Sequence, residues 1–312
     1  MGEAALPGVA AIRESGWVSP ISGELYCRAW QPIAPHDGAG VYLLHGLGEH
    51  VGRYDALAAF LCQRGWHVAS HDHHGHGRSA GRRGTMPRAQ ALTDDATELV
   101  ASFERMLGRP PIVLGHSLGG ALAAELVVVR GVPARGLVLS SPALDPGMNP
   151  VQKLLLALME RLAPGLAIGN GLDPQRISHD AGVVAAYRDD PLVHDRVSAR
   201  VVRWLVDTGL ASVRRAGALE TDVLLLVSGA DTLVDPLAAR RFADAAPPRA
   251  PRCTGTTRPG TSCSTRSSRY AVMPMSSSAP GWTPGARGRG GASAGSVSCR
   301  EPAVAGCRAL SP

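Results

Sequence analysis

Short apolar runs alternate along the chain with longer segments in which apolar residues recur at helical spacing. The spacing predicts helices over 53–65, over 89–107 and directly after residue 117, and an opening β-hairpin that turns at residues 22–23. Strands that alternate with helices form a mostly parallel sheet covered on both faces, so the pattern predicts an α/β fold. The runs that predict buried strands are 40–44, 66–70, 112–114, 135–140 and 221–228.

The pattern changes between residue 144 and about residue 209, where five prolines separate short helical segments. We predict that 144–209 is a helical cap inserted into a core made of residues 1–143 and 210–248. The cap contains an apolar segment, KLLLALMERLAPGLAI, at 153–168. Such a stripe most often packs in the core, so we expect it to lie against the sheet, and the alternative is that it contacts a lipid surface or admits an acyl chain.

Composition changes again in the last part of the chain. Residues 249–312 are rich in Gly, Ser, Arg, Pro and Thr and have no periodic apolar segment. We therefore predict a disordered tail, with the last strand and the covering helix of the sheet missing. From residue 251 onward the tail holds eight arginines and one glutamate, whereas the whole chain has a net charge of +6. The rest is close to neutral, so no nucleic-acid partner is expected, although the Arg-Gly run at 285–291 leaves RNA as an alternative.

The sequence GHSLG at 115–119 lies between a predicted strand and a predicted helix. A G-x-S-x-G motif in this setting is typical of the nucleophile elbow of α/β-hydrolases. A Cβ atom at position 115 or 119 would collide with neighbouring backbone, and Ser117 would occupy the strained apex with its hydroxyl exposed. The alternative is a glycine-rich turn that merely contains a serine.

Two further segments supply partners for such a serine. In the α/β-hydrolase plan, the loop after an early strand and the residue after the nucleophile supply the N–H groups of the oxyanion hole, which nominates Leu47 and Leu118. Asp231 follows the strand at 221–228, where the acid of a Ser, Asp, His triad belongs. Asp235 is a rival, but it precedes Pro236 and is typical of a helix N-cap.

Five histidines lie between residues 67 and 76, which raises the hypothesis of a metal site. The loop has no helical pair of histidine ligands, and glycine-rich chain is a poor rigid cage. We expect a structural loop in which Gly75 and Gly77 permit the turn while Asp72 and Ser79 bind backbone amides. No metal or other cofactor is expected. The chain has neither an apolar run of membrane-spanning length nor a signal-like start, so a cytoplasmic location is expected.

Together these segments give the chain a resemblance to a known family, the monoacylglycerol lipases and lysophospholipase-like α/β-hydrolases of serine aminopeptidase S33 type. The resemblance implies an α/β-hydrolase fold and cleavage of an ester between a fatty acyl chain and glycerol or a related alcohol. It implies Ser117 as nucleophile, Asp231 as triad acid, and Leu47 and Leu118 as oxyanion-hole residues. The matching segments are HGLGEHVGRYDALA (45–58), HDHHGHGRSAG (71–81), GHSLGG (115–120), SHDAGVVAAYRDDPLVH (178–194) and LLLVSGADTLVDP (224–236).

The chain departs from the family pattern where the triad histidine is expected. The family has this histidine in H-E-[LI]-F-N-E, but no histidine follows His194 here. A serine without its base is a weak nucleophile at neutral pH, so we expect impaired activity. The alternative function is a catalytically silent fold that binds an acyl ligand or a protein partner. A third possibility is that His179 or His194 of the cap acts as the base.

The missing motif leads to a prediction about the gene. Triplets made from the third base of one codon and the first two of the next can spell W-H-E-L-F-N-E across residues 259–266. We therefore expect that the tail is the family's C-terminus read in a shifted frame. Sequencing codons 245–275 checks this: third bases that do not spell the motif would leave a genuine low-complexity tail as the explanation.

Overall fold

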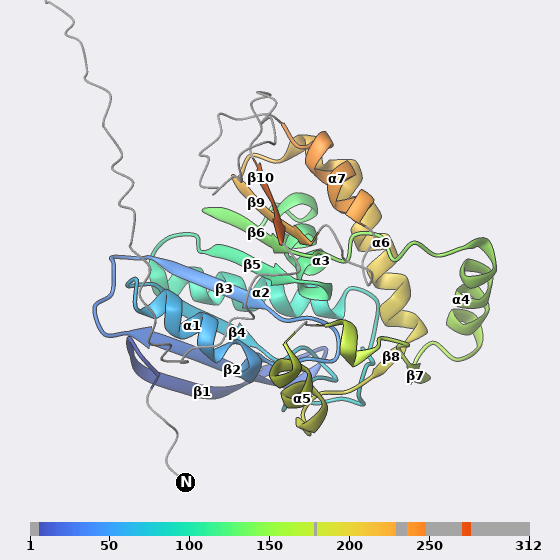
Figure 1. Cartoon of the computed structure of the whole chain (residues 1–312), viewed down its shortest axis with the longest axis horizontal. Helices are drawn as coiled ribbons and strands as arrows, with labels where there is room; N and C mark the ends of the chain where they lie inside the picture. The colour runs from blue at the N-terminus through green and yellow to red at the C-terminus, as the bar shows by residue number, and fades with distance from the viewer. Residues whose placement is uncertain (1–5, 178–179, 229–235, 248–269, 276–312) are drawn as a thin grey trace, which may run out of the picture. The chain divides into compact units, whose positions relative to one another are not determined.

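An eight-stranded sheet forms the centre of residues 1–282, the first of two units in the chain. The computed structural model describes residues 6–177, 180–228, 236–247 and 270–275, so the second unit, residues 283–312, lies outside it. The strand order is β1-β2-β4-β3-β5-β6-β9-β10 (Figure 1). The strands are β1 (Val9–Ser19), β2 (Gly23–Pro32), β3 (Gly40–Leu44), β4 (His67–His71), β5 (Ile112–His116), β6 (Gly136–Ser140), β9 (Val223–Ser228) and β10 (Tyr270–Met275).

The pairing confirms the predicted α/β fold. β1 and β2 form the expected antiparallel hairpin, and β2 joins the sheet antiparallel to β4. Every other pair in this sheet, from β4–β3 to β9–β10, is parallel. Parallel neighbours need crossover connections, and the connecting segments here hold the helices α1 (Asp55–Cys62), α2 (Ala91–Leu107), α3 (Leu118–Ala124) and α7 (Pro236–Ala245).

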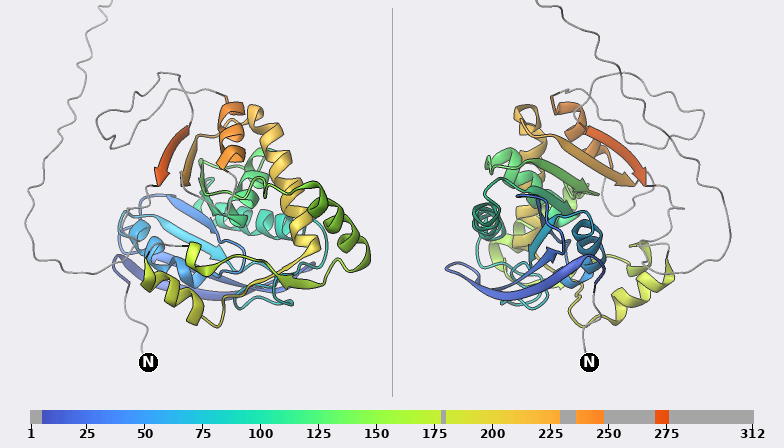
Figure 2. Two further views of the ribbon diagram at one scale, coloured as in Figure 1. Left: turned by 45° about the vertical axis from the view of Figure 1, so that its right-hand side comes forward. Right: turned by 90° about the vertical axis from the view of Figure 1, so that its left-hand side faces the viewer.

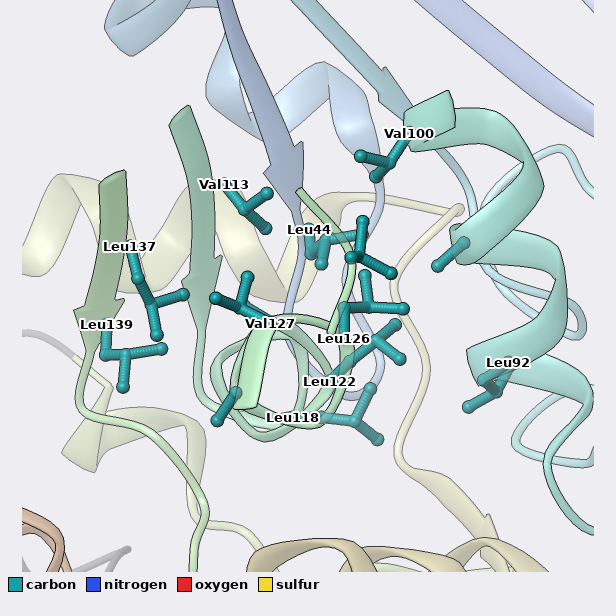
Figure 3. Packing of buried hydrophobic residues seen from close by; sticks show 14 of the residues in the cluster. Leu44, Leu92, Val100, Val113, Leu118, Leu122, Leu126, Val127, Leu137 and Leu139 are labelled. Carbon is teal, nitrogen blue, oxygen red and sulfur yellow. The ribbon is translucent and has the colours of Figure 1, made fainter. Parts of the chain in front are cut away.

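Helices cover both faces of the sheet and create two apolar clusters. In the right view of Figure 2, α1 lies on one side of the sheet and α2 on the other. α1 contributes Ala58 and Cys62 to a small cluster that also includes Trp30 and Val68. The larger cluster lies under α2, α3, α6 (Ala199–Arg215) and α7. Figure 3 shows its centre, where side chains that follow the elbow face those of the strands: Leu118, Leu122, Leu126 and Val127 with Leu44, Val113, Leu137 and Leu139.

The helix after the elbow changes its winding before it ends. All seven residues of α3 are buried, and the chain continues as a π-helical turn over Glu125–Val129. Isolated π-helical turns of this kind interrupt α-helices. Glu125 on this turn is buried and lies 3.6 Å from Arg130, measured from Oε1 to Nε. Burial raises the pKa of Glu125, and the Arg130 guanidinium counteracts part of that rise.

The region predicted as a cap contains short elements between β6 and β9. They are α4 (Pro150–Leu162), β7 (Ala167–Gly169), η3 (Pro174–Arg176), α5 (Ala181–Asp189), β8 (Arg196–Ser198) and α6, which spans the predicted boundary at residue 209. β7 and β8 pair antiparallel as a separate two-stranded sheet. Among the described helices, none combines the length and apolar character needed to cross a bilayer.

The apolar segment at 153–168 does not pack against the sheet, so that expectation is wrong. In α4 the one buried residue is Leu156, whereas Leu154 is 72% exposed. Figure 1 shows α4 beyond α6, on the side away from the sheet. Helical periodicity marks an apolar stripe but not the surface that covers it. The exposed apolar residues of this region are Val151, Leu154, Leu155, Leu158, Leu162, Leu166 and Ile168, named here the α4 stripe.

The missing last strand stays a prediction, and a short strand lies at the edge where the last strand would pair. β10 (Tyr270–Met275) pairs parallel with β9 in register, from Tyr270 with Val223 to Met275 with Ser228. The segment YAVMPM contains a proline, which argues against a central strand, but among the described strands β10 has one neighbour, and proline is tolerated at a sheet edge. Any covering helix after β10, and the predicted disorder over most of the tail, fall outside the described residues.

Candidate active site

Ser117 stands at a strained turn between β5 and α3. Its backbone has φ +51° and ψ −115°, a left-handed conformation that is uncommon for a residue with a Cβ atom. The Ser117 N–H donates to Ser140 O (3.0 Å), and its carbonyl accepts from Ala121 N–H (3.1 Å) and Ala143 N–H (3.0 Å). These bonds from three segments hold the turn, while the side chain is half-buried.

The glycines on either side of Ser117 are required by space, as predicted. A Cβ at Gly115 would lie 2.1 Å from Gly119 O, and a Cβ at Gly119 would lie 2.1 Å from Leu44 O. Both contacts are with backbone, which cannot rotate away as a side chain can. The first turn of α3 therefore rests directly on the carboxyl end of β3, beside the loop that follows it.

That loop, residues 45–50, is named here the oxyanion loop because it contains Leu47, which the sequence predicts as an oxyanion-hole residue. Gly48 has φ +77°, and the Glu49 carboxylate accepts the Gly46 N–H (3.1 Å) and the Tyr54 hydroxyl (2.7 Å). Leu118 is the first residue of α3, so its N–H has no partner within the helix. Among the described residues, neither the Leu47 nor the Leu118 N–H makes a hydrogen bond. Leu118 directly follows the strained serine in the chain.

The histidine-rich loop after β4 has the predicted structural role. Asp72 accepts the Val51 N–H (2.7 Å) and the Arg78 N–H (2.8 Å) through its two carboxylate oxygens. The Ser79 hydroxyl accepts the Tyr26 N–H (2.9 Å) and donates to Asp72 O (2.5 Å). Burial raises the pKa of Asp72, and its backbone donors lower it.

The histidines beside this loop bind one another and the backbone. His45 Nε2 accepts the His73 N–H (3.0 Å), His73 Nδ1 lies 3.2 Å from His71 Nε2, and His71 Nδ1 lies 3.0 Å from the Tyr42 hydroxyl. Burial lowers the pKa of His45, His71 and His73, with neighbouring histidines adding to the effect, so these rings are neutral at pH 7. Within the described part of the chain, no three His, Cys, Asp or Glu side chains come together to hold a metal ion.

His194, a candidate substitute base, is engaged elsewhere. Its ring lies 4.6 Å from the His76 ring between centroids, and its Nδ1 accepts the Arg196 N–H (3.1 Å). Burial and the Arg83 charge lower the pKa of His194 to about 4. His179, the other candidate base, lies outside the described residues, as do Asp231 and Asp235. The helix predicted after Asp235 begins at Pro236, as α7.

A family model for serine aminopeptidase S33 matches residues 35–258, which is more than half of the chain. The chain belongs to the serine aminopeptidase S33 family of α/β-hydrolases. Members of this family and its homologues are serine hydrolases.

Individual relatives of this S33 chain agree with the match. It is 34% identical over 226 residues to a monoacylglycerol lipase of Mycolicibacterium smegmatis, covering 69% of this chain and 78% of that protein. It is 32% identical over 228 residues to an uncharacterized abhydrolase domain-containing protein of Dictyostelium discoideum, of which it spans 24%. The crystal structure of a monoacylglycerol lipase of Paleococcus ferrophilus has 35% identity and a TM-score of 0.64, covering 72% of this chain and 84% of that one.

Sequence reasoning missed several residues that shape the site of this S33 hydrolase. Glu49 holds the oxyanion loop from one side, and Asp190 contacts His50 of the same loop through a 2.7 Å bond between Oδ2 and Nε2. Arg53 lies over the Tyr187 ring, 4.8 Å from its centroid. Glu49 and Asp190 both lie inside the segments that carry the family resemblance, and this position was the one feature of the sequence that could have pointed to them. The contact between Asp190 and His50 joins residues 140 positions apart, so no local pattern identifies it.

The pKa of His194 gives a pH-dependent stability. His194 takes up a proton near pH 6.5 in the unfolded state but only near pH 4 in the folded state. Its contribution to the free energy of unfolding therefore falls as the pH drops from 6.5 to 4. We expect His194→Asn, which keeps an acceptor for the Arg196 N–H, to flatten this fall, as measured by urea unfolding across that range. The exposed His36→Asn is the control. Equal pH slopes in wild type and His194→Asn would contradict the prediction.

Proposed function

We propose that the chain is a carboxylic ester hydrolase of monoacylglycerol lipase type, acting on acylglycerols or related lipid esters. The observation that carries the proposal is the strained Ser117 between β5 and α3, and among the described residues the Leu47 and Leu118 N–H groups make no hydrogen bond. The relatives named monoacylglycerol lipase support the substrate class. The proposal requires no cofactor, and a cytoplasmic location is part of it.

The proposed reaction follows the acyl-enzyme route. Ser117 Oγ attacks the ester carbonyl carbon, and the carbonyl oxygen becomes an oxyanion that accepts hydrogen bonds from the Leu47 and Leu118 N–H groups. The tetrahedral intermediate collapses, the C–O bond to the alcohol breaks, and the alcohol leaves with a proton. Water then attacks the acyl-serine and releases the fatty acid. Fixed backbone donors suit this step, since losing one typically costs about a hundredfold or more in rate.

Proton transfer is the weak point of this chain. In the proposed triad, Asp231 would orient a histidine that takes the proton from Ser117 and returns it to the leaving alcohol. No histidine follows His194 in the sequence. His194 itself packs against His76 and has its pKa lowered to about 4, which makes it a poor base. We therefore propose that turnover is impaired, and a silent fold that binds an acyl ligand or a protein partner is the second candidate.

The α4 stripe supports a further part of the proposal, which is contact with a lipid surface. In α4 its residues recur at helical spacing, and Val151 and Leu162 are 74% and 71% exposed. Apolar side chains gathered on one exposed face mark an interaction site, and an amphipathic helix with basic residues at its flanks suits the bilayer interface. The stripe also has Lys153 and Arg161 on the same helix. Such contact would bring the cap to the membrane that holds the lipid esters.

The first prediction concerns turnover. The 312-residue chain is expected to hydrolyse p-nitrophenyl butyrate at close to the buffer rate, because loss of the triad histidine costs on the order of 10⁶ in turnover in a serine protease such as subtilisin. A chain whose tail is translated in the shifted frame from codon 253 should gain at least about a thousandfold. Ser117→Ala in that corrected chain should abolish the gain.

Rapid hydrolysis by the 312-residue chain would contradict the proposed impairment. A fluorophosphonate probe separates the two candidate functions: labelling of Ser117 in the 312-residue chain indicates an activated nucleophile. An unlabelled Ser117 in both chains would favour the silent fold.

The second prediction concerns the lipid surface. The double variant Leu154→Asp and Leu158→Asp should weaken binding to phosphatidylcholine vesicles by about tenfold or more, since it places charge where apolar contact is proposed. Cosedimentation with vesicles measures this. Ile33→Asp, at a side chain that is 69% exposed far from α4 in sequence, is the matched control. Equal losses in both variants would show that the α4 stripe has no special role.

A further inference from the structure

A segment of the cap region lies against the oxyanion loop. Residues 190–198, named here the docking segment, meet the loop first at Gly48, where the His194 N–H donates to Gly48 O (3.0 Å). A Cβ at Gly48 would lie 2.2 Å from His194 O, so the two backbones are in direct contact. Gly48 follows Leu47, whose N–H is proposed to face the oxyanion. The cap therefore contacts the loop one residue away from a catalytic donor.

The second contact joins two side chains. Asp190 Oδ2 accepts from His50 Nε2 at 2.7 Å, and the side chains of His50 and Asp190 are 10% and 23% exposed. His50 Nδ1 accepts the Gly52 N–H (3.2 Å), so the proton of the ring is on Nε2 and points to Asp190. Burial acts to raise the pKa of Asp190, but the bonds from His50 and the Leu192 N–H outweigh it and hold the pKa below its usual value. The bond is therefore charge-assisted at neutral pH.

His50 transmits this contact to the loop and to the helix behind it. Its side chain is the N-cap of the 3-10 helix η1 (Val51–Tyr54), and its backbone ends the oxyanion loop. On the other side of the loop, Glu49 binds the Gly46 N–H. The loop is thus held between Glu49, which belongs to it, and the docking segment, which does not. Removing the outer contact leaves Leu47 fixed from one side.

The far end of the docking segment leads to the α4 stripe. β8, residues 196–198 of the segment, pairs with β7, and residues 163–166 connect β7 to the end of α4. Asn170 N–H also donates to Asp195 O (2.6 Å), and Ser198 N–H donates to Gly84 O (2.8 Å). The chain between α4 and β7, the β7–β8 pairing and the His194–Gly48 bond therefore connect the exposed apolar helix to the oxyanion loop, while the Ser198–Gly84 bond ties β8 to the segment after β4.

We propose that Asp190 is a positioning residue: through His50 it fixes the oxyanion loop, and the docking segment couples the placement of α4 to the Leu47 N–H. The catalytic meaning of this coupling rests on the proposed function, whereas the coupling itself does not. A shift of α4 moves β7 and β8, and with them the contacts at Gly48 and His50. The cap then controls the geometry of the oxyanion hole as well as access to it.

Hydrogen exchange tests the positioning role without requiring turnover. Asp190→Ala should speed hydrogen exchange in peptides covering residues 45–54 by about tenfold or more, because the loop can then open without breaking the bond between Asp190 and His50. Asp190→Asn, which keeps an acceptor for His50, should recover part of the protection, and the exposed neighbour Asp189→Ala should have no effect. In ¹⁵N spectra, Asp190→Ala should shift the His50 Nε2 resonance while the other histidines stay in place.

Unchanged exchange at residues 45–54 in Asp190→Ala would overturn the proposal. So would an equal acceleration over residues 111–124, since that would indicate general loosening of the core. If the chain with the tail in the shifted frame stayed inactive while the exchange pattern was as expected, the ester hydrolase would be rejected and the positioning role would stand.

Phosphatidylcholine vesicles test the coupling to α4. Vesicles at saturating concentration should change exchange over residues 45–54 severalfold in the wild type and in Ile33→Asp, but not in Asp190→Ala. Vesicle binding that leaves the loop unchanged in the wild type would overturn the coupling. Failure to bind vesicles at all would reject both the lipid-surface contact and its transmission, while the Asp190→Ala result still decides the positioning role.

Discussion

The close contact between the start of α3 and the ends of β3 and β5 is the constraint on which the site depends. Backbone touches backbone there, with Gly115 against Gly119 and Gly119 against Leu44, and a single methyl group at either glycine would prevent it. The contact places Ser117 in a strained conformation and sets the start of α3 against the end of β3, beside the oxyanion loop. It also buries the whole of α3 in the main core, so the same packing stabilises the fold and holds the turn at Ser117.

Much of this arrangement was predictable because its causes are local. The apolar runs marked the strands β3 to β6 and β9, and the glycines at 115 and 119 carried their own steric reason. Asp72 and Ser79 were expected to bind backbone amides in a glycine-rich turn, and they do so. In each case the residues that decide the structure lie within a few positions of the residue predicted. Asp231, by contrast, stays a prediction, since it lies outside the described residues.

What the sequence did not reveal depends on partners distant along the chain. The α4 stripe has the same periodicity as the apolar face of a core helix. It is exposed because α4 lies beyond α6, on the side away from the sheet. His50 and Asp190 are separated by 140 positions, so their bond cannot be read from spacing. The neutral histidines around His73 likewise owe their state to burial by several elements, which a count of histidines in a loop does not convey.

The edge position of β10 has an evolutionary consequence. An edge strand forms backbone hydrogen bonds with one neighbouring strand and has no second strand on its other side. Its amino-acid sequence is therefore less constrained than that of a central strand. The open side of β9 can therefore accept a segment of unrelated composition, provided it is extended and long enough to cover the exposed carbonyl and amide groups. A lineage could exchange the end of such a chain and keep its sheet, while the catalytic residues once encoded there disappear. Fold and activity would then be inherited separately.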